Sequence, residues 1–218
     1  MKLLKYTSAW LLCINLCAGP TASAQVIYDP MSNRPYYTSP GDQSGNPLIV
    51  SGWNAGTILG ENGTRYKGIK VNYDVLQKNV VFKINDDAIY VFNDPVKEFT
   101  IDGGTGGQSR RFVRSDNIHT QLPGSFVEVL VSGTTGFYKL IVKSIVEVTE
   151  YNSMPRKAIE EKVHYYVVRE GNVLRATLSK KSLEELFPTS GDYIRQEKLY
   201  PKNESDWIRL IAHLNEKK

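Results

Sequence analysis

The feature that most constrains the fold is an alternation of apolar and polar residues that recurs, with short interruptions, through residues 53–178. In the stretch 66–75, apolar residues occupy every second position: Ile69, Val71, Tyr73 and Val75. Successive side chains of a β-strand point to opposite faces, so this pattern predicts strands with one buried and one solvated face. Further runs of this kind predict about ten strands, including 80–84, 89–91, 99–101, 127–131, 140–148, 163–167 and 173–178.

The segments between these runs carry the residue types of tight turns. Asn62-Gly63, Ser132-Gly133 and Glu170-Gly171-Asn172 are typical of hairpins. Between the strands we find no clear helical crossover of about a dozen residues, which argues against a parallel nucleotide-binding sheet. The sequence therefore predicts a mainly β fold over residues 52–178. Its strands form an antiparallel meander, which is either an open sheet or a partly closed barrel or sandwich.

The period changes after Leu178, where the sequence predicts two or three α-helices in residues 179–218. Ser179 begins the first helix, which ends at Pro188, and a second short helix covers 190–198. The third begins at Asn203 and carries an apolar stripe at helical spacing: Trp207, Leu210, Ile211 and Leu214. We expect this stripe to pack on the β domain; a groove in a partner protein is the alternative.

The amino end has the pattern of a secretory signal peptide. Lys2 and Lys5 precede a nine-residue apolar run at 10–18, which only Asn15 interrupts. Residues 22–24, Ala-Ser-Ala, form a small-x-small cleavage site. We therefore expect residues 1–24 to be removed after Ala24, and the run is about half the length that a membrane-spanning helix needs.

Cleavage at this site would remove every thiol from the protein. Both Cys13 and Cys17 lie in the signal, and 218 residues less 24 leave 194 without cysteine. Neither cysteine follows a small residue, because Leu12 and Leu16 precede them, so lipidation is disfavoured. Disulfides, thiolate metal sites and cysteine nucleophiles are therefore excluded from the mature chain. Its net charge falls from +4 to +2, which gives no reason to expect nucleic acid as a partner.

Residues 25–51 are rich in proline and glycine and predict an extended or loosely docked amino-terminal arm. Within it, Tyr36 and Tyr37 are candidates for aromatic docking. They could lie on the chain's own domain, which is the simpler interpretation, or present a surface on which a ligand stacks.

A glycine-rich run at 102–107 is followed by three arginines, Arg110, Arg111 and Arg114. Consecutive glycines let a backbone approach a phosphate, but phosphate loops place a helix directly afterwards, and here the following segment has strand character. The arginines are therefore candidates for contact with an anionic ligand. A simple connection between two strands is the alternative.

We find no signature of catalysis or of a cofactor. The three histidines, His119, His164 and His213, are far apart in sequence and have no metal-binding spacing. A serine-nucleophile elbow is absent, and Ser115, Asp116 and His119 match a triad in composition only. The sequence thus assigns no catalytic, cofactor-binding or metal-binding residue.

Several segments resemble an uncharacterised group of small secreted proteins common in Bacteroidota. These segments are 46–56, 66–75 and 94–99 in the β region, and Lys180–Phe187 and Asp206–Leu214 near the carboxyl end. The resemblance implies a secreted or envelope location and a plan of strands followed by helices. It transfers no functional residue.

These observations favour a non-catalytic module of the cell envelope, periplasmic or extracellular, that binds a hydrophobic or polymeric ligand or another envelope protein. Its partner is unknown, no cofactor is expected, and peripheral attachment to a membrane stays open. Two alternatives are a hydrolase with an unrecognised carboxylate or serine site, and an outer-membrane barrel.

Overall fold

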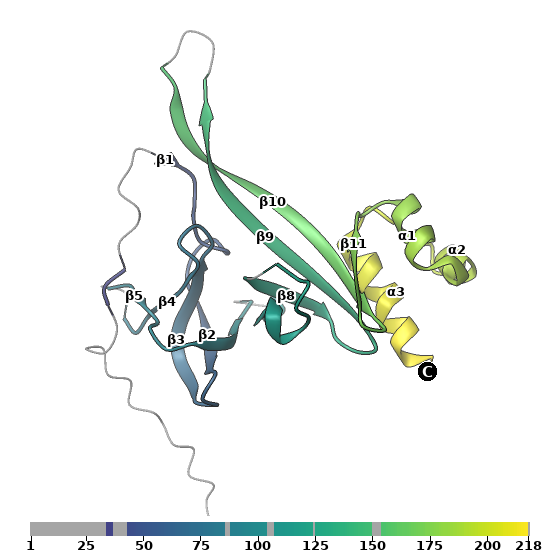
Figure 1. The fold of residues 1–218 in the computed structure, drawn as a ribbon, viewed down its shortest axis with the longest axis horizontal. Helices are drawn as coiled ribbons and strands as arrows, with labels where there is room; N and C mark the ends of the chain where they lie inside the picture. The colour runs from purple at the N-terminus through teal and green to yellow at the C-terminus, as the bar shows by residue number, and fades with distance from the viewer. Residues whose placement is uncertain are drawn as a thin grey trace, which may run out of the picture.

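The computed structural model describes residues 34–36, 43–85, 88–103, 107–123, 125–149 and 154–217, and the prediction of a mainly β fold is confirmed. These residues form an 11-stranded sheet followed by three α-helices (Figure 1). The strands are β1 (Gln43–Ser44), β2 (Asn54–Gly60), β3 (Arg65–Asp74), β4 (Asn79–Lys83), β5 (Tyr90–Val91), β6 (Val96–Ile101), β7 (Arg110–Arg114), β8 (Phe126–Val131), β9 (Thr135–Val148), β10 (Arg156–Arg169) and β11 (Asn172–Ala176).

The strand order is β1-β10-β9-β8-β7-β6-β2-β3-β4-β5, with β11 also paired to β10. Neighbouring strands are antiparallel except β1, which runs parallel to β10. The chain departs from a simple meander twice: β6 returns to pair with β2 rather than with β5, and β1 pairs with β10 rather than with β2. The two ends of the path do not pair, so the sheet is open rather than closed.

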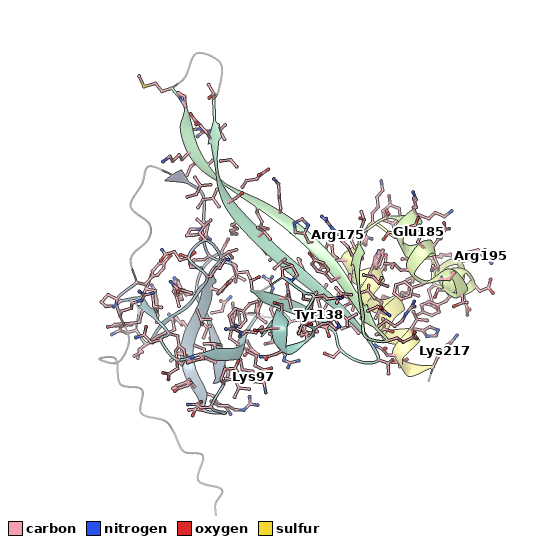
Figure 2. All side chains as sticks on the ribbon, in the orientation of Figure 1. Lys97, Tyr138, Arg175, Glu185, Arg195 and Lys217 are labelled. Carbon is pink, nitrogen blue, oxygen red and sulfur yellow. The ribbon has the colours of Figure 1, made fainter. Side chains whose placement is uncertain are left out.

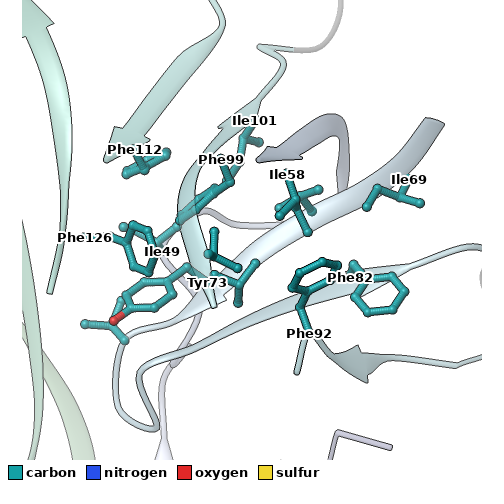
Figure 3. Close-up of a cluster of buried hydrophobic side chains, with 14 of the residues drawn as sticks. Ile49, Ile58, Ile69, Tyr73, Phe82, Phe92, Phe99, Ile101, Phe112 and Phe126 are labelled. Atoms are coloured by element: carbon teal, nitrogen blue, oxygen red, sulfur yellow. The ribbon is translucent and has the colours of Figure 1, made fainter. Parts of the chain in front are cut away.

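The first strands enclose a cluster of rings and branched side chains, which we call the aromatic core (Figure 3). Phe99 is fully buried at its centre, stacked on Phe112 at 4.8 Å between ring centroids and edge-on to Phe126 at 5.1 Å. Strands from β2 to β9 contribute to this cluster, which shows that the sheet curls around it. Its buried members are Ile49, Ile58, Ile69, Val71, Tyr73, Val75, Val80, Phe82, Phe92, Val96, Phe99, Ile101, Phe112, Phe126 and Ile141.

The helices build a second cluster, the helical core, at the other end of the sheet. They are α1 (Lys180–Leu186), α2 (Gly191–Gln196) and α3 (Glu204–Glu216). Trp207 of α3 is fully buried and stacks on Phe137 of β9, and its indole nitrogen donates to the carbonyl oxygen of Pro201 at 2.7 Å. The cluster comprises Phe137, Val167, Ala176, Leu183, Phe187, Leu199, Trp207, Leu210 and Ile211. The expected packing of the third helix on the sheet is therefore seen.

Side-chain hydrogen bonds cap the start of α1 and tie the end of α3 to the sheet. Ser179 caps α1, as its position before the helix predicts, because its hydroxyl accepts from the amide of Ser182 at 3.2 Å. Near the end of α3, Asn215 accepts from the amide of Thr135 and donates to its carbonyl, both at 2.9 Å. Gly133 in this turn has φ +147°, and a β-carbon there would meet the Asn215 amide at 2.5 Å.

Strands β9 and β10 form the longest element, a twisted ribbon that runs from the helices past the first strands and projects beyond them (Figure 1). The helical core covers only one end of this ribbon. No helix among the described residues is long and apolar enough to cross a membrane.

Candidate functional site

Each of the three candidate arginines is paired with a carboxylate. Arg110 makes two bonds of 2.7 Å to Glu128, whereas Arg111 bonds Glu98 at 2.5 Å. Arg114 bonds Asp116 at 3.0 Å.

These arginines do not converge. Residues 110 and 114 lie on one face of β7 and 111 on the other, because side chains alternate along a strand. Glu128 is buried, and its hydrogen bond raises the pKa of Arg110 above its usual value against the opposing effect of burial. An anion would therefore have to compete with carboxylates already in place.

Tyr36 lies on the chain's own domain, and Tyr37 lies outside the described residues. The Tyr36 hydroxyl donates to the buried Asp74 carboxylate at 2.6 Å, and its amide donates to Ile89 at 2.9 Å. Burial, and then the bond to Asp74, raise the pKa of Tyr36 above its ordinary value. The side chain is a structural anchor that holds residues 34–36 beside β5.

The other chemistry-bearing residues are dispersed. The Ser115 hydroxyl is buried and donates to the Pro123 carbonyl, Asp116 pairs with Arg114, and His119 accepts from the amide of Gln121 at 3.2 Å. These three residues therefore do not form a triad. His164 contacts Arg175 at 3.0 Å, and no group of three or more metal-ligating residues exists in the described part of the chain.

A cavity of about 680 Å³ lies between α1 and α2, and we call it the α1–α2 groove. Its size is within the range of small-molecule sites. Apolar side chains line it from both helices and from the two connecting segments: Leu183, Phe187, Pro188, Ile194, Leu199 and Pro201. Leu183, Phe187 and Leu199 belong to the helical core, so the floor of the groove is apolar.

Local backbone signals create the groove. Pro188 stops α1 and begins a 3-10 turn at Pro188–Ser190 that leads directly into α2. After α2, Lys198 has a left-handed φ of +51°, which turns the chain back toward α3. Because α1 and α2 are both short, their apolar sides meet only partly.

The rim of the α1–α2 groove is basic. Lys180, Arg195 and Lys198 line it together with one acid, Glu184. Lys180 and Glu184 form a loose pair at 3.7 Å. Arg195, which is labelled in Figure 2, is exposed and pairs with Asp192. Lys198 is exposed and has no ion-pair partner among the residues that the structure describes. A negatively charged group at this rim would gain a cation without displacing a carboxylate.

Two buried polar atoms near α2 have no hydrogen-bond partner among the described residues: the Ser190 hydroxyl oxygen and Nε2 of His213. The ring of His213 stacks on Tyr193 at 3.7 Å between centroids, and Tyr193 lies one helical turn after Ser190. Ser190 also lines a second cavity of about 380 Å³, with Arg169.

The sequence did not single out the α1–α2 groove. Its apolar residues have the spacing of ordinary core positions, and only the short lengths of α1 and α2 leave space between them. The one available signal was Pro188 between two short helical segments, which predicts a bend but not a cavity.

Comparison with known proteins gives no match: no family model fits the chain, and no curated protein or solved structure is significantly similar to it. Function must be inferred from the geometry of the chain itself.

Proposed function

We propose that the chain is an exported, non-catalytic binding module of the cell envelope, and that the α1–α2 groove is its ligand site. The observation that carries the proposal is an apolar floor and a basic rim around one cavity of about 680 Å³. The ligand is an amphipathic molecule with an apolar chain and an anionic group.

The floor supplies the affinity and the rim supplies the orientation. Each square ångström of apolar surface that leaves water contributes roughly 25 cal/mol, so a chain of several methylenes gains several kcal/mol before the costs of binding. The exposed Lys198 then favours a ligand whose negative group stays at the water boundary. A purely polar ligand would gain nothing from the apolar floor, and a cationic ligand would be repelled by the basic rim.

Export is supported by the sequence of the amino end. Two lysines, an apolar run and a small-x-small site in residues 1–24 are the pattern of a cleaved signal. Amphipathic ligands of this chemistry are abundant in a cell envelope, since membrane lipids supply them.

The test is a fluorescence titration of the protein with a dansyl-labelled eleven-carbon carboxylic acid. We expect saturable binding of one probe per chain. The substitution Ile194→Asp places a charge on the apolar floor and should weaken binding more than about tenfold. Lys198→Ala should weaken it about three- to tenfold at low salt and less at high salt.

Two controls separate the groove from general stickiness. Lys97→Ala removes an exposed lysine beside a different surface cavity and should leave the affinity unchanged. The methyl ester of the probe should bind wild type and Lys198→Ala equally. Absence of saturable binding, or equal binding by wild type and Ile194→Asp, would overturn the proposal.

A further inference from the structure

The projecting part of the β9–β10 ribbon has an unpaired edge. β8 pairs with β9 only at residues 137–139. From Leu140 to Val148, β9 pairs with β10 on one side and forms no backbone hydrogen bond on the other among the described residues. Such an edge is a template for another strand, and native proteins either protect it or use it.

Beyond Leu140 and Ile141, which are buried, several side chains of this part of the ribbon are apolar and exposed. Ile145 is 47% exposed and Val142 is 37% exposed, and Val163 of β10 is 38% exposed. The stretch Leu140–Val148 is also rich in β-branched residues, which favour strands. Only Lys143 and Glu147 interrupt it with charge.

We propose that a second copy of this chain pairs with this edge, β9 against β9 in antiparallel orientation, with Ile145 on the two-fold axis. In that register Lys143 of each copy lies opposite Glu147 of the other copy. A two-fold axis perpendicular to the sheet requires a residue to lie opposite its own copy. Moving the axis to Ser144 or Val146 would leave both charges opposite apolar or neutral residues.

The neighbouring strand extends this complementarity. Within one copy, Lys143 faces Glu161 of β10, with the charged atoms 3.2 Å apart, and Glu147 faces Lys157. Across the four central strands of the dimer, charges therefore alternate in a row from Glu161 through Lys143 to the second copy's Glu147 and Lys157. Opposite charges across strands stabilise a sheet, and like charges destabilise it.

The row between the two charged rows is apolar. Ile145 lies opposite Ile159 in the β9–β10 register, so pairing places four isoleucines side by side on one face of the sheet. The arm runs over this face: Lys143 donates to the carbonyls of Asn46 and Leu48 at 2.9 and 2.7 Å. A β-carbon on Gly45 would lie 2.9 Å from Cβ of Ile159, so the arm packs tightly there. The outer isoleucines are thus partly covered and the two central ones are exposed.

A cysteine crosslink tests directly which residues of the two β9 strands lie opposite each other. In the full chain with Cys13→Ser and Cys17→Ser, Ile145→Cys places two thiols directly opposite each other, within disulfide reach of about 4.4–6.8 Å between α-carbons. Mild oxidation with copper phenanthroline should give a covalent dimer in high yield. Glu147→Cys is the matched control, because its two copies would stand four positions apart, about 13 Å, and should not crosslink.

Sedimentation velocity of the otherwise unmodified protein supplies the equilibrium test. We expect a concentration-dependent dimer that Glu147→Lys weakens about tenfold, because the symmetry places two like-charge pairs in one interface. Glu216→Lys changes the net charge equally at the end of α3 and should leave the dimer intact. A monomer at all concentrations, a dimer insensitive to Glu147→Lys, or crosslinking of Glu147→Cys as efficient as that of Ile145→Cys would each overturn the proposal.

Discussion

The aromatic core and the helical core are built on one sheet, yet they leave different surfaces. The curled strands close around the aromatic core, so that Phe99 and Phe112 meet no solvent. The helices cover the other end only in part, because α1 and α2 are short and leave a cavity of about 680 Å³ over Leu183 and Phe187. We therefore propose a division of labour, in which the aromatic core stabilises the fold and the helical end binds the ligand.

The difference between the two regions is tested most strongly by truncating one side chain in each and comparing the loss of stability. Phe99→Ala removes a fully buried ring from the aromatic core and should lower the free energy of unfolding by about 3–5 kcal/mol. Ile194→Ala removes a half-buried side chain from the α1–α2 groove and should cost about 1 kcal/mol. Urea denaturation followed by circular dichroism measures both. Equal losses would show that the groove is as important to the fold as the aromatic core.

The pH dependence of stability tests the aromatic core in a second way. Burial, and then the charge of Asp74, raise the pKa of Tyr73 to about 12, partly offset by Arg114. The folded state then holds a proton that the unfolded chain releases near pH 10. The stabilisation is present below pH 10 and is lost between pH 10 and 12, at up to about 1.4 kcal/mol per pH unit for one proton.

Tyr73→Phe removes this proton and should make the loss of stability above pH 10 less steep. Urea denaturation at pH 8, 10 and 11 measures the change, and Tyr200→Phe, an exposed tyrosine near the groove, serves as the control. An identical slope in Tyr73→Phe and wild type would contradict the assignment.

The arginines of β7 give the smallest expected effects. Arg110→Ala leaves the buried Glu128 without its two charged hydrogen bonds and should cost about 1–2 kcal/mol. Arg111→Ala breaks a pair whose arginine is 47% exposed and should cost less than about 1 kcal/mol. Thermal unfolding compares the two variants; a larger loss for Arg111→Ala would contradict the burial argument.

The sequence predicted the architecture because strand and helix periods are local properties. Alternation at 66–75 yielded β3, and the i, i+3, i+4 spacing of Trp207, Leu210 and Ile211 yielded the buried face of α3. The start of α1 at Ser179 followed in the same way. The return of β6 to β2 was not predictable, because strand partners depend on contacts between residues far apart in the chain.

The candidate site shows a similar limit. Arg110 and Arg111 were singled out as neighbours in sequence, but the strand points them to opposite faces and partner strands supply carboxylates to both. The α1–α2 groove depends on how far two helices stand apart, and no spacing pattern encodes that distance. The sequence therefore shows which residues are charged, but it does not show which of them are paired. Lys198, for example, has no ion-pair partner among the described residues.

The most direct test of this division of labour is amide chemical-shift mapping of the ¹⁵N-labelled protein during titration with undecanoate. Because all assigned amides report at once, one experiment compares both regions in the same sample. We predict saturable shifts concentrated in residues 180–201 and unchanged amides in residues 54–101. Shifts centred on residues 54–101, or no saturable shift anywhere, would contradict the account.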